Sequence, residues 1–434
     1  MYAQNLNIRN FNHSSMFKSV NGILHVEDVS VVELVEKLGT PLYITSRSKL
    51  EANLKAYKDA FPEAGLLYAV KANNNISIMR IIARKGFGAD VFSGGELYMA
   101  MLAGFKPETI LFNGNSKSDD EIRMGVKTGV KFSVDSLDEL YTISEIALEE
   151  GKDVEMAFRI NPEIDPKTHP KIATGLKTSK FGIPWGRVLD AYRIALELPN
   201  IVPIGIHCHI GSQITELSPF VEALNRLFDV AVKLEEMGIE VKFLDLGGGL
   251  GIDYEGKGAP TPKDFANIIL PVFEKRSKEL RSKPELWLEP GRSIVGDTTI
   301  LLTRVNAVKR SYKNFVAVDA GFNLLIRPAM YGAYHRVAVA NKMDKPAEDV
   351  YTIVGPICES GDILAEDRKL PKVEKGDLIV IFDTGAYGFV MSSQYNGRPR
   401  CAEVLVDGSR WYVIRERESY YDLIGRQMIP DFLL

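Results

Sequence analysis

Residues 201–251 read IVPIGIHCHIGSQITELSPFVEALNRLFDVAVKLEEMGIEVKFLDLGGGLG, which has the pattern of one strand–helix–strand unit. The apolar runs 201–210 and 241–246 are rich in Val, Ile, Leu and Phe, as is typical of strands buried on both faces. Residues 218–237 between them have the spacing of an amphipathic helix. Because parallel strands need such a crossover, this stretch predicts a parallel α/β fold.

The same alternation extends over residues 66–291. Further apolar runs lie at 66–70, 87–92, 109–113, 130–135, 154–160 and 285–289. Further amphipathic segments lie at 75–84, 137–150 and 188–198. Eight strands that alternate with helices predict a (β/α)8 TIM-like barrel, and an open doubly wound sheet is the structural alternative.

After Arg292 the pattern changes to β-branched and aromatic runs without intervening helices. These runs lie at 300–321, 349–358, 377–388, 402–408 and 410–417, and they predict a β-rich C-terminal domain. The run 22–30 predicts an N-terminal strand that completes this domain, and we expect residues 1–20 to be irregular. The predicted domains are an N-terminal segment over 1–45 that packs with the β-rich domain, the barrel over 46–295 and the β-rich domain over 296–434.

Composition excludes several classes of function. Among 434 residues, 53 Lys and Arg stand against 57 Asp and Glu, so no basic excess is present to bind nucleic acid or an anionic membrane surface. Cys208, Cys358 and Cys401 are too few and too widely spaced for a disulfide framework, which favours a reducing compartment. No apolar run is long enough for a membrane span or a signal core, so we expect a cytoplasmic protein.

Polar residues follow the predicted strands of the barrel, where catalytic side chains of such barrels lie. They are Lys71, Asp90, Asn113, Asp135, Arg159, His209, the glycines 247–249 and Glu289. A buried strand also returns to water through a polar residue. For Asn113 and Asp135 that alternative stays open.

Lys71 directly follows five apolar residues. A lysine in this position is partly desolvated, which lowers its pKa and frees its amine as a nucleophile for an aldehyde. The alternative is an ordinary charge at the rim of the barrel. Asp90, one strand further, is placed to orient the ammonium group, and its alternative role is a turn or helix cap.

The glycines at 247, 248, 249 and 251 do not form a GxGxxG fingerprint, which argues against a nicotinamide dinucleotide. Consecutive glycines at a strand–helix junction nevertheless expose N–H groups for a phosphate, and a tight turn is the alternative. In WLEPGRS, the carboxylate of Glu289 is suited to bind a cationic ring nitrogen, and the guanidinium of Arg292 is suited to bind an anionic group. The alternative is an ion pair between Glu289 and Arg292.

His207 and His209 form an H-x-H pair without further ligands at metal spacing, so we expect no metal. The role that fits His209 better is that of a flat ring which stacks beneath an aromatic cofactor. An aldehyde-reactive lysine, a glycine cradle for phosphate and a carboxylate for a ring nitrogen together predict pyridoxal 5′-phosphate.

Several motifs, in order, strengthen this interpretation. They are YAVKANNN (68–75), GADVFSGGE (88–96), HPKIATGLKTSKFGI (169–183), HCHIGSQ (207–213), LDLGGGLGIDY (244–254), EPGRSIVG (289–296), GPICESGD (355–362) and DTGAYGFVMSSQYNGRPR (383–400). Through them the chain resembles the diaminopimelate decarboxylase family, within the alanine racemase-like, fold type III group of pyridoxal phosphate enzymes. The resemblance covers nearly the whole chain beyond residue 20 and implies a cofactor-binding barrel followed by a β-rich domain.

The resemblance also implies roles for individual residues. The catalytic residues would be Lys71, which forms the Schiff base, His209, which stacks on the cofactor ring, and Cys358, the general acid. The cofactor-binding residues would be Lys71, Asp90, His209, Ser212, Gly247, Gly248, Gly249, Glu289, Gly291, Arg292 and Tyr387. The substrate-binding residues would be Arg292, Arg327, Tyr331, Glu359 and Tyr387. Cys358 and Glu359 would reach the active site of a second copy, which implies a homodimer.

The implied reaction is decarboxylation of meso-2,6-diaminopimelate to L-lysine and CO2, the last step of lysine biosynthesis. A carboxylate at Glu289 keeps the ring nitrogen protonated, which favours decarboxylation over racemisation. Arg327, Tyr331 and Glu359 supply a cation, a hydroxyl and an acceptor for a second amino-acid head group. The alternatives are a related decarboxylase of ornithine, arginine or carboxynorspermidine, and an inactive relative that binds the cofactor. For Cys358 alone, a small buried hydrophobic residue is the alternative.

Overall fold

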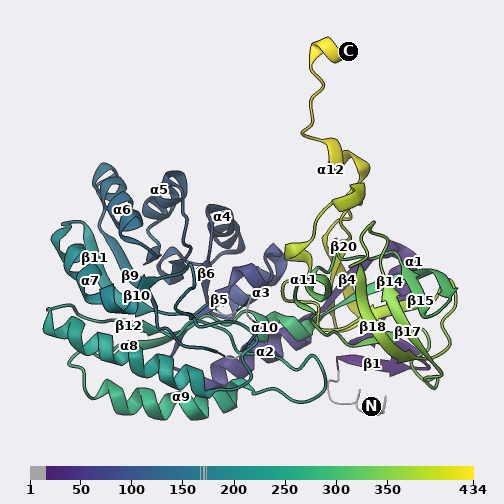
Figure 1. Ribbon diagram of the computed structural model, residues 1–434, viewed down its shortest axis with the longest axis horizontal. Coiled ribbons are helices and arrows are strands. Elements are labelled where there is room, and N and C mark those ends of the chain that lie inside the picture. Colours follow the sequence, from purple (N-terminus) through teal and green to yellow (C-terminus); the bar gives the residue numbers. More distant parts are fainter. Residues whose placement is uncertain (1–15, 167, 170–171, 173) are drawn as a thin grey trace. The chain divides into compact units, whose positions relative to one another are not determined.

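The computed structural model describes residues 16–434 except 167, 170–171 and 173, so part of the 169–183 motif lies outside the described residues. The chain forms two compact units. One is Asn53–Ile294, and the other combines the described residues before Asn53 with Val295–Leu434. We call them the barrel unit and the β unit, and Figure 1 shows the helices and strands of each.

In the described part of the chain, eight parallel strands of the barrel unit form a closed ring. The ring closes because β13 pairs with β5, while β8 pairs with β9. This closure confirms the predicted TIM-like barrel and excludes the open sheet. The strands are β5 (Gly65–Ala69), β6 (Gly88–Val91), β7 (Ile110–Phe112), β8 (Lys131–Val134), β9 (Val154–Asn161), β11 (Ile201–His207), β12 (Phe243–Asp245) and β13 (Glu285–Leu288). The two-residue strand β10 (Ile183–Pro184) pairs with the outer part of β9.

Helices alternate with these strands, and several begin at residues that cap them. The Asn75 side chain accepts the N–H of Ser77, and Ser118 with Glu121 forms a capping box. Gly129 ends its helix in the left-handed conformation. The helices are α2 (Arg47–Ala60), α3 (Ile76–Arg84), α4 (Gly94–Ala103), α5 (Asp119–Thr128), α6 (Leu137–Glu150), α7 (Val188–Glu197), α8 (Ser218–Glu236), α9 (Pro262–Ser277) and α10 (Arg292–Val295), with short turns η2 (Val70–Ala72), η3 (Pro107–Thr109) and η5 (Trp185–Arg187).

The β unit is built around the long strand β14 (Thr299–Arg310). Its first half pairs with β4 on one side and β19 on the other, and its second half pairs with β15. The other strands are β4 (Leu42–Ser46), β15 (Asn314–Val318), β16 (Val337–Val339), β17 (Asp349–Val354), β18 (Ile363–Leu370), β19 (Leu378–Ile381), β20 (Ala402–Asp407) and β21 (Arg410–Arg415). Its helical segments are α1 (Val31–Leu38), α11 (Arg327–Tyr331), α12 (Tyr420–Ile424), η6 (Gly296–Thr298), η7 (Phe389–Met391), η8 (Tyr395–Gly397) and η9 (Asp431–Leu433).

An N-terminal strand does complete the β unit, but it is β4 and not the run 22–30. Residues 22–30 form β2 (Ile23–Val26) and β3 (Val29–Ser30), which join β1 (Phe17–Val20) in a separate antiparallel sheet. The reason is local, because Gly22 and Glu27 have positive φ and turn the chain back on itself. The residues 17–20, expected to be irregular, are therefore a strand.

Strand β4 is buried along its whole length and lies between β14 and β20. Its Ile44 packs in one apolar cluster with Leu24 of β2, Leu302 of β14 and Val404 of β20. This cluster joins the N-terminal segment to strands more than 250 residues later in the chain. Among the described residues, no helix is long and apolar enough to cross a membrane.

We predict that Ile44→Ala destabilises the β unit by about 2–5 kcal/mol, because it leaves a cavity in a fully buried strand. The measurement is the midpoint of denaturant unfolding, monitored by the circular dichroism signal of β structure. Val413→Ala on the exposed face of β21 is the matched control, and it should change stability by less than about 0.5 kcal/mol. Equal midpoints for the two variants would contradict the central place of β4.

Candidate active site

Lys71 and Asp90 meet at the carboxyl ends of neighbouring strands β5 and β6. Lys71 lies in η2, directly after β5, and its Nζ donates to Asp90 Oδ2. The Asp90 side chain is fully buried, whereas 31% of the Lys71 side chain is exposed. Burial, and then repulsion from Glu289, raises the pKa of Asp90, and the Lys71 ammonium opposes that rise. The result is an amine with one side toward solvent and a buried carboxyl behind it.

Asn113, which follows β7, joins this pair to Glu289. Its Nδ2 donates to Asp90 Oδ1 at 2.7 Å and to Glu289 Oε1 at 2.7 Å. One amide group therefore lies between two buried carboxyl groups that would otherwise repel each other. The sequence left Asn113 open between a site residue and an ordinary strand end, and the structure places it inside the network.

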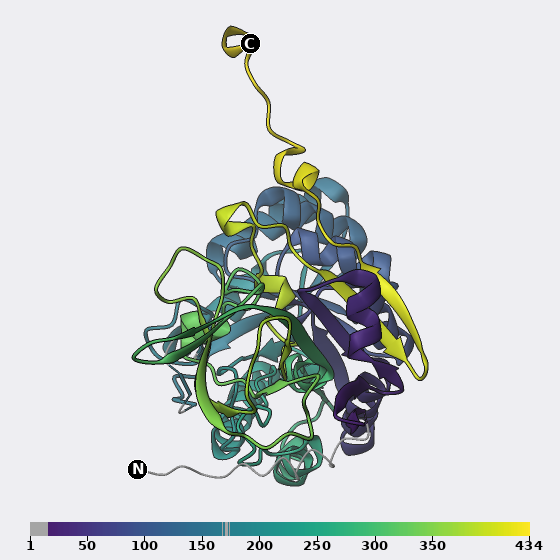
Figure 2. The same cartoon turned by 90° about the vertical axis from the view of Figure 1, so that its right-hand side faces the viewer.

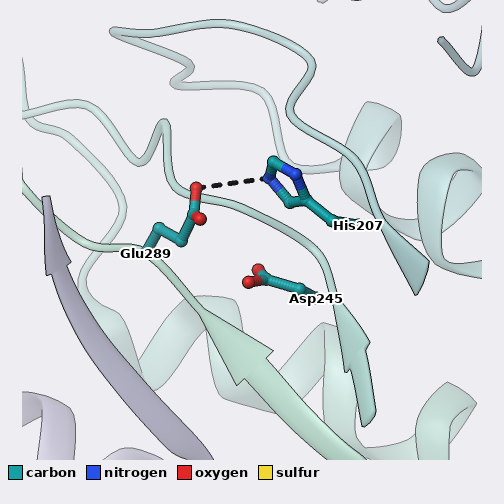
Figure 3. A group of neighbouring side chains, drawn as sticks. All are labelled: His207, Asp245 and Glu289. Atoms are coloured by element: carbon teal, nitrogen blue, oxygen red, sulfur yellow. Dashed lines mark ion pairs between the residues drawn. The ribbon is translucent and has the colours of Figure 1, made fainter. Parts of the chain in front are cut away.

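Glu289 follows β13 and faces His207, the last residue of β11 (Figure 3). His207 Nε2 lies 3.4 Å from Glu289 Oε2, and its Nδ1 lies 2.7 Å from the hydroxyl of Ser133 on β8. Burial opposes ionisation of Glu289, but attraction to His207 and Lys71 outweighs it and lowers the pKa of Glu289. Glu289 is therefore held as an anion in the interior of the barrel mouth.

Asp245, the last residue of β12, is the third buried carboxyl group here. Its Oδ1 accepts the N–H of Gly247 at 2.8 Å, and its Oδ2 has no hydrogen-bond partner among the described residues. Burial, and then repulsion from Glu289, raises the pKa of Asp245 well above its usual value. His207, Asp245 and Glu289 each offer an atom within 4.8 Å of the others, and this is the set that a metal ion would use. It differs from the H-x-H pair considered in the sequence, because His209 is not part of it.

His209 contacts the glycine turn instead. Its Nδ1 accepts the N–H of Gly248 at 3.2 Å, and burial, reinforced by Arg159 and Lys71, lowers its pKa well below the usual value. The imidazole is therefore neutral. A Cβ at Gly248 would overlap the carbonyl oxygen of Glu289, and Gly247 and Gly249 both have positive φ. The glycines therefore form a tight turn, as one of the two interpretations of the sequence predicts, and phosphate binding by this turn stays a prediction.

Arg292, at the start of α10, lies beside the same turn. Its Nη2 donates to the Ser212 hydroxyl at 2.9 Å, and its Nη1 donates to the Tyr254 hydroxyl at 2.8 Å. A Cβ at Gly291 would come within 2.9 Å of Ala69 Cβ, so glycine lets this turn pack against the end of β5. A buried guanidinium and a serine hydroxyl next to a glycine turn form a set of donors for an anionic group.

The β unit carries the other predicted site residues. Cys358 is exposed, which removes the buried-hydrophobe alternative, and Asn396 holds it from two sides. The Cys358 N–H donates to Asn396 Oδ1 at 2.9 Å, and Asn396 Nδ2 donates to Cys358 Sγ at 3.1 Å. Tyr395 donates to Glu359 Oε1 at 2.8 Å, and this bond raises the pKa of Tyr395 to about 12.

Arg327, Tyr331 and Tyr387 also lie in the β unit. Arg327 is buried at the start of α11, and its Nη1 lies 2.9 Å from Nε2 of His335, whose Nδ1 lies 2.8 Å from the carbonyl oxygen of Phe382. That carbonyl accepts from Nδ1–H, so Nε2 is the acceptor for the guanidinium. Tyr331 ends α11 and is half-buried. Tyr387 has a φ of 56°, an uncommon conformation for a tyrosine.

Glu418 anchors the loop that carries Tyr395 and Asn396. Its carboxylate accepts from Gln394 Nε2 at 2.9 Å, from the Arg400 N–H at 2.8 Å and from Arg400 Nε at 2.7 Å. Burial opposes ionisation, but these donors lower the pKa of Glu418 to about 2. The C-terminal segment therefore helps to hold the loop next to Cys358.

Four residues of the site have no distinctive signal in the sequence: Ser133, Asp245, Tyr395 and Asn396. Ser133 and Asp245 are polar residues within the apolar runs 130–135 and 241–246. A polar residue in a buried strand is the one local sign of their role. Asn396 precedes Gly397 in a YNG turn and has a φ of 59°, which asparagine tolerates. Its contact with Cys358 depends on two loops 38 residues apart, so no local pattern indicates it.

Comparison with known proteins gives a consistent result. A family model of the pyridoxal binding domain of pyridoxal-dependent decarboxylases matches residues 47–296. A diaminopimelate decarboxylase of Archaeoglobus fulgidus is 72% identical over 419 residues, which cover 96% of this chain and 100% of that protein. The diaminopimelate decarboxylase of Methanocaldococcus jannaschii is 45% identical over 427 residues, which cover 95% and 97%. The crystal structure of diaminopimelate decarboxylase from M. jannaschii in complex with L-lysine has a TM-score of 0.92 at 44% identity, over 96% of this chain and 99% of that one.

We predict that Glu418→Gln destabilises the β unit by about 1–2 kcal/mol at pH 7, because charge-assisted hydrogen bonds are lost and solvent weakens part of their effect. The folded pKa is depressed, so the wild-type advantage is present above the unfolded value of about 4.5 and is lost as pH falls toward 2. Unfolding midpoints from pH 7 to pH 3 check this. The exposed neighbour Glu416→Gln is the control, and a wild-type advantage that grows in acid would contradict the assignment.

Proposed function

The chain belongs to the diaminopimelate decarboxylase family of pyridoxal-dependent decarboxylases, and on this premise we propose that its barrel mouth converts meso-diaminopimelate to L-lysine and CO2. The observation that carries the proposal is the hydrogen-bonded series Lys71–Asp90–Asn113–Glu289. It puts a primary amine and an ionised carboxylate into one barrel mouth, next to a glycine turn. In this role the enzyme performs the last step of lysine biosynthesis in the cytoplasm.

The residues of the barrel mouth fit pyridoxal 5′-phosphate. The cofactor, when bound, supplies an aldehyde that condenses with amines and a ring that accepts the electrons released when CO2 leaves. An amine, a neutral imidazole, an anion for the ring nitrogen and a set of donors for a phosphate all lie in segments that follow the barrel strands. The residues that would hold it are Lys71, Asp90, His209, Ser212, Gly247, Gly248, Gly249, Glu289, Gly291 and Arg292, with Tyr387 from the β unit.

Glu289 has the most specific task in this scheme. An anion next to the ring nitrogen keeps a proton on that atom, and only the protonated ring accepts electrons fully. Asn113 and His207 each contact one oxygen of Glu289, so its carboxylate is oriented as well as ionised. Asp90 and Asp245, whose pKa values are raised, contribute less negative charge to the same space.

Lys71 would hold the cofactor by its amine and release it to the amine of the substrate. Asp90 accepts from the ammonium group of Lys71, and 31% of the Lys71 side chain is exposed, so a substrate amine could reach it from solvent. A buried carboxyl with a raised pKa is also a partner that accepts a proton from Lys71 at modest cost.

Cys358 is the proposed acid that returns a proton to the carbon from which CO2 has left. Asn396 holds the sulfur by Nδ2 and the backbone N–H of Cys358 by Oδ1, so the thiol has a defined direction. Asn396 is thus a positioning residue, in that it acts through Cys358.

The distal amino-acid head of the substrate needs a cation for its carboxylate and an acceptor for its ammonium. We assign these tasks to Arg327 and Glu359, with Arg292, Tyr331 and Tyr387 as further substrate contacts. Glu359 and Cys358 are exposed on their own unit, and we propose that both act in the barrel mouth of a second copy in a homodimer. In the same scheme, residues 46–295 form the domain that binds the cofactor. Residues 1–45 belong with the β-rich domain, residues 296–434.

Lys71→Ala should abolish the visible absorption band of bound pyridoxal phosphate and reduce turnover by at least ~10³-fold, because the nucleophilic amine is lost. Absorption spectra of the purified proteins and lysine release from meso-diaminopimelate check both effects. Lys117→Ala, which removes a buried lysine bonded to Glu139, is a control for general disruption and should keep the absorption band. Faster turnover of ornithine or arginine than of meso-diaminopimelate by the wild type would overturn the substrate assignment.

Mixing Lys71→Ala with Cys358→Ala should restore activity, because each mixed dimer has one site with both residues intact. Random exchange of subunits predicts recovery of about a quarter of the wild-type activity, from two proteins that are each nearly inactive. Turnover measured before and after co-refolding tests this. If the mixture stays as inactive as its parts while mixed dimers form, Cys358 does not act in the partner's site.

A further inference from the structure

The C-terminal tail, residues 420–434, presents large apolar side chains to solvent. Figures 1 and 2 show it in yellow, leaving the strands of the β unit in both views. Eight of its side chains are between 58% and 91% exposed: Tyr420, Tyr421, Ile424, Met428, Ile429, Phe432, Leu433 and Leu434. A segment that remains in water is normally polar and charged, so this composition indicates a surface that is covered in the functional protein.

The root of the tail is firmly attached to the β unit. Arg417 donates to the carbonyl oxygens of Pro41 at 2.7 Å and Leu38 at 3.2 Å. Glu418 accepts hydrogen bonds from Gln394 and Arg400. Beyond Ser419 every described side chain except Leu423 is exposed. The root of the tail is therefore fixed to the β unit, while the apolar residues of the tail are uncovered.

The same attachment connects the tail to the residues proposed to act in a second copy. Glu418 holds the loop 394–400, whose Tyr395 and Asn396 contact Glu359 and Cys358. A second copy that receives Cys358 is therefore brought close to the root of the tail. A two-fold dimer makes every such contact twice, so both tails would be covered at once.

We propose that residues 420–434 dock onto a second copy of this chain and anchor the homodimer. The inference rests on the proposed function in one respect, namely that Cys358 and Glu359 act in the partner's site. The composition of the tail supports it, because Tyr, Phe and Met are enriched in protein interfaces. Tyr420, Tyr421 and Phe432 are the residues expected to contribute most.

The test compares dimer dissociation of three cofactor-loaded proteins by sedimentation velocity over a dilution series. A chain that ends at Ser419, and a full-length chain with Ile429→Asp and Phe432→Asp, should both raise the dissociation constant at least ~100-fold, because interface anchors carry most of the binding free energy. Tyr312→Ala is the matched control. Tyr312 is an equally exposed aromatic residue outside the tail, and its removal should leave dissociation unchanged.

Circular dichroism and the absorption band of the cofactor establish that each variant is folded. Unchanged dissociation of the Ser419 chain overturns the proposal. A monomeric wild type whose tail binds phosphatidylcholine–phosphatidylserine vesicles overturns it in favour of a membrane surface. Decarboxylation by the wild type is measured separately. If the tail controls the dimer but the wild type does not decarboxylate meso-diaminopimelate, the docking surface stands and the proposed function fails.

Discussion

Repulsion among three buried carboxyl groups is the constraint on which the barrel mouth depends. Asp90 lies near the end of β6, Asp245 ends β12, and Glu289 directly follows β13. Burial of like charges is unfavourable unless donors compensate it. The Asn113 amide lies between two of them, and His207 lies against Glu289. The outcome is asymmetric, because Glu289 is held ionised while the other two are shifted toward the neutral form. Carboxyl groups whose pKa values are shifted in opposite directions can perform different chemical tasks in one site.

The two units hold their functional groups in different ways. In the barrel, strand ends fix the side chains, and glycines such as Gly248 and Gly291 let the backbone approach that closely. In the β unit, loops hold exposed groups through hydrogen bonds, as Asn396 does for Cys358. Cys358 is exposed on its own unit, and its thiol is therefore accessible to another surface.

Much of the barrel was predictable because each strand and helix is encoded locally. Six of the eight predicted strand runs contain the observed strands, while β5 and β9 each extend one residue beyond their predicted runs. The segment 137–150 matches α6 at both ends. The N-terminal strand was misplaced, since β4 is short and sits between a proline and a helix, whereas 22–30 looks longer but is folded back at Glu27. The sequence pattern does not predict β18, because four consecutive residues of ILAEDRKL, 366–369, are charged and Asp367 has a positive φ, so the alternation of a strand is missing.

The sequence alone determined the fold class and the family and indicated candidate site residues at the strand ends, because periodicity and motifs are properties of short segments. Lys71 and Glu289 were evident for that reason. Only the tertiary structure decided how Glu289 is kept ionised, that Asp245 joins it, and that Asn396 directs Cys358. These facts depend on closure of the ring and on contacts between distant loops. Electrostatic interactions and hydrogen bonds act through space, so the environment of each of these groups depends on residues that are far apart in the chain.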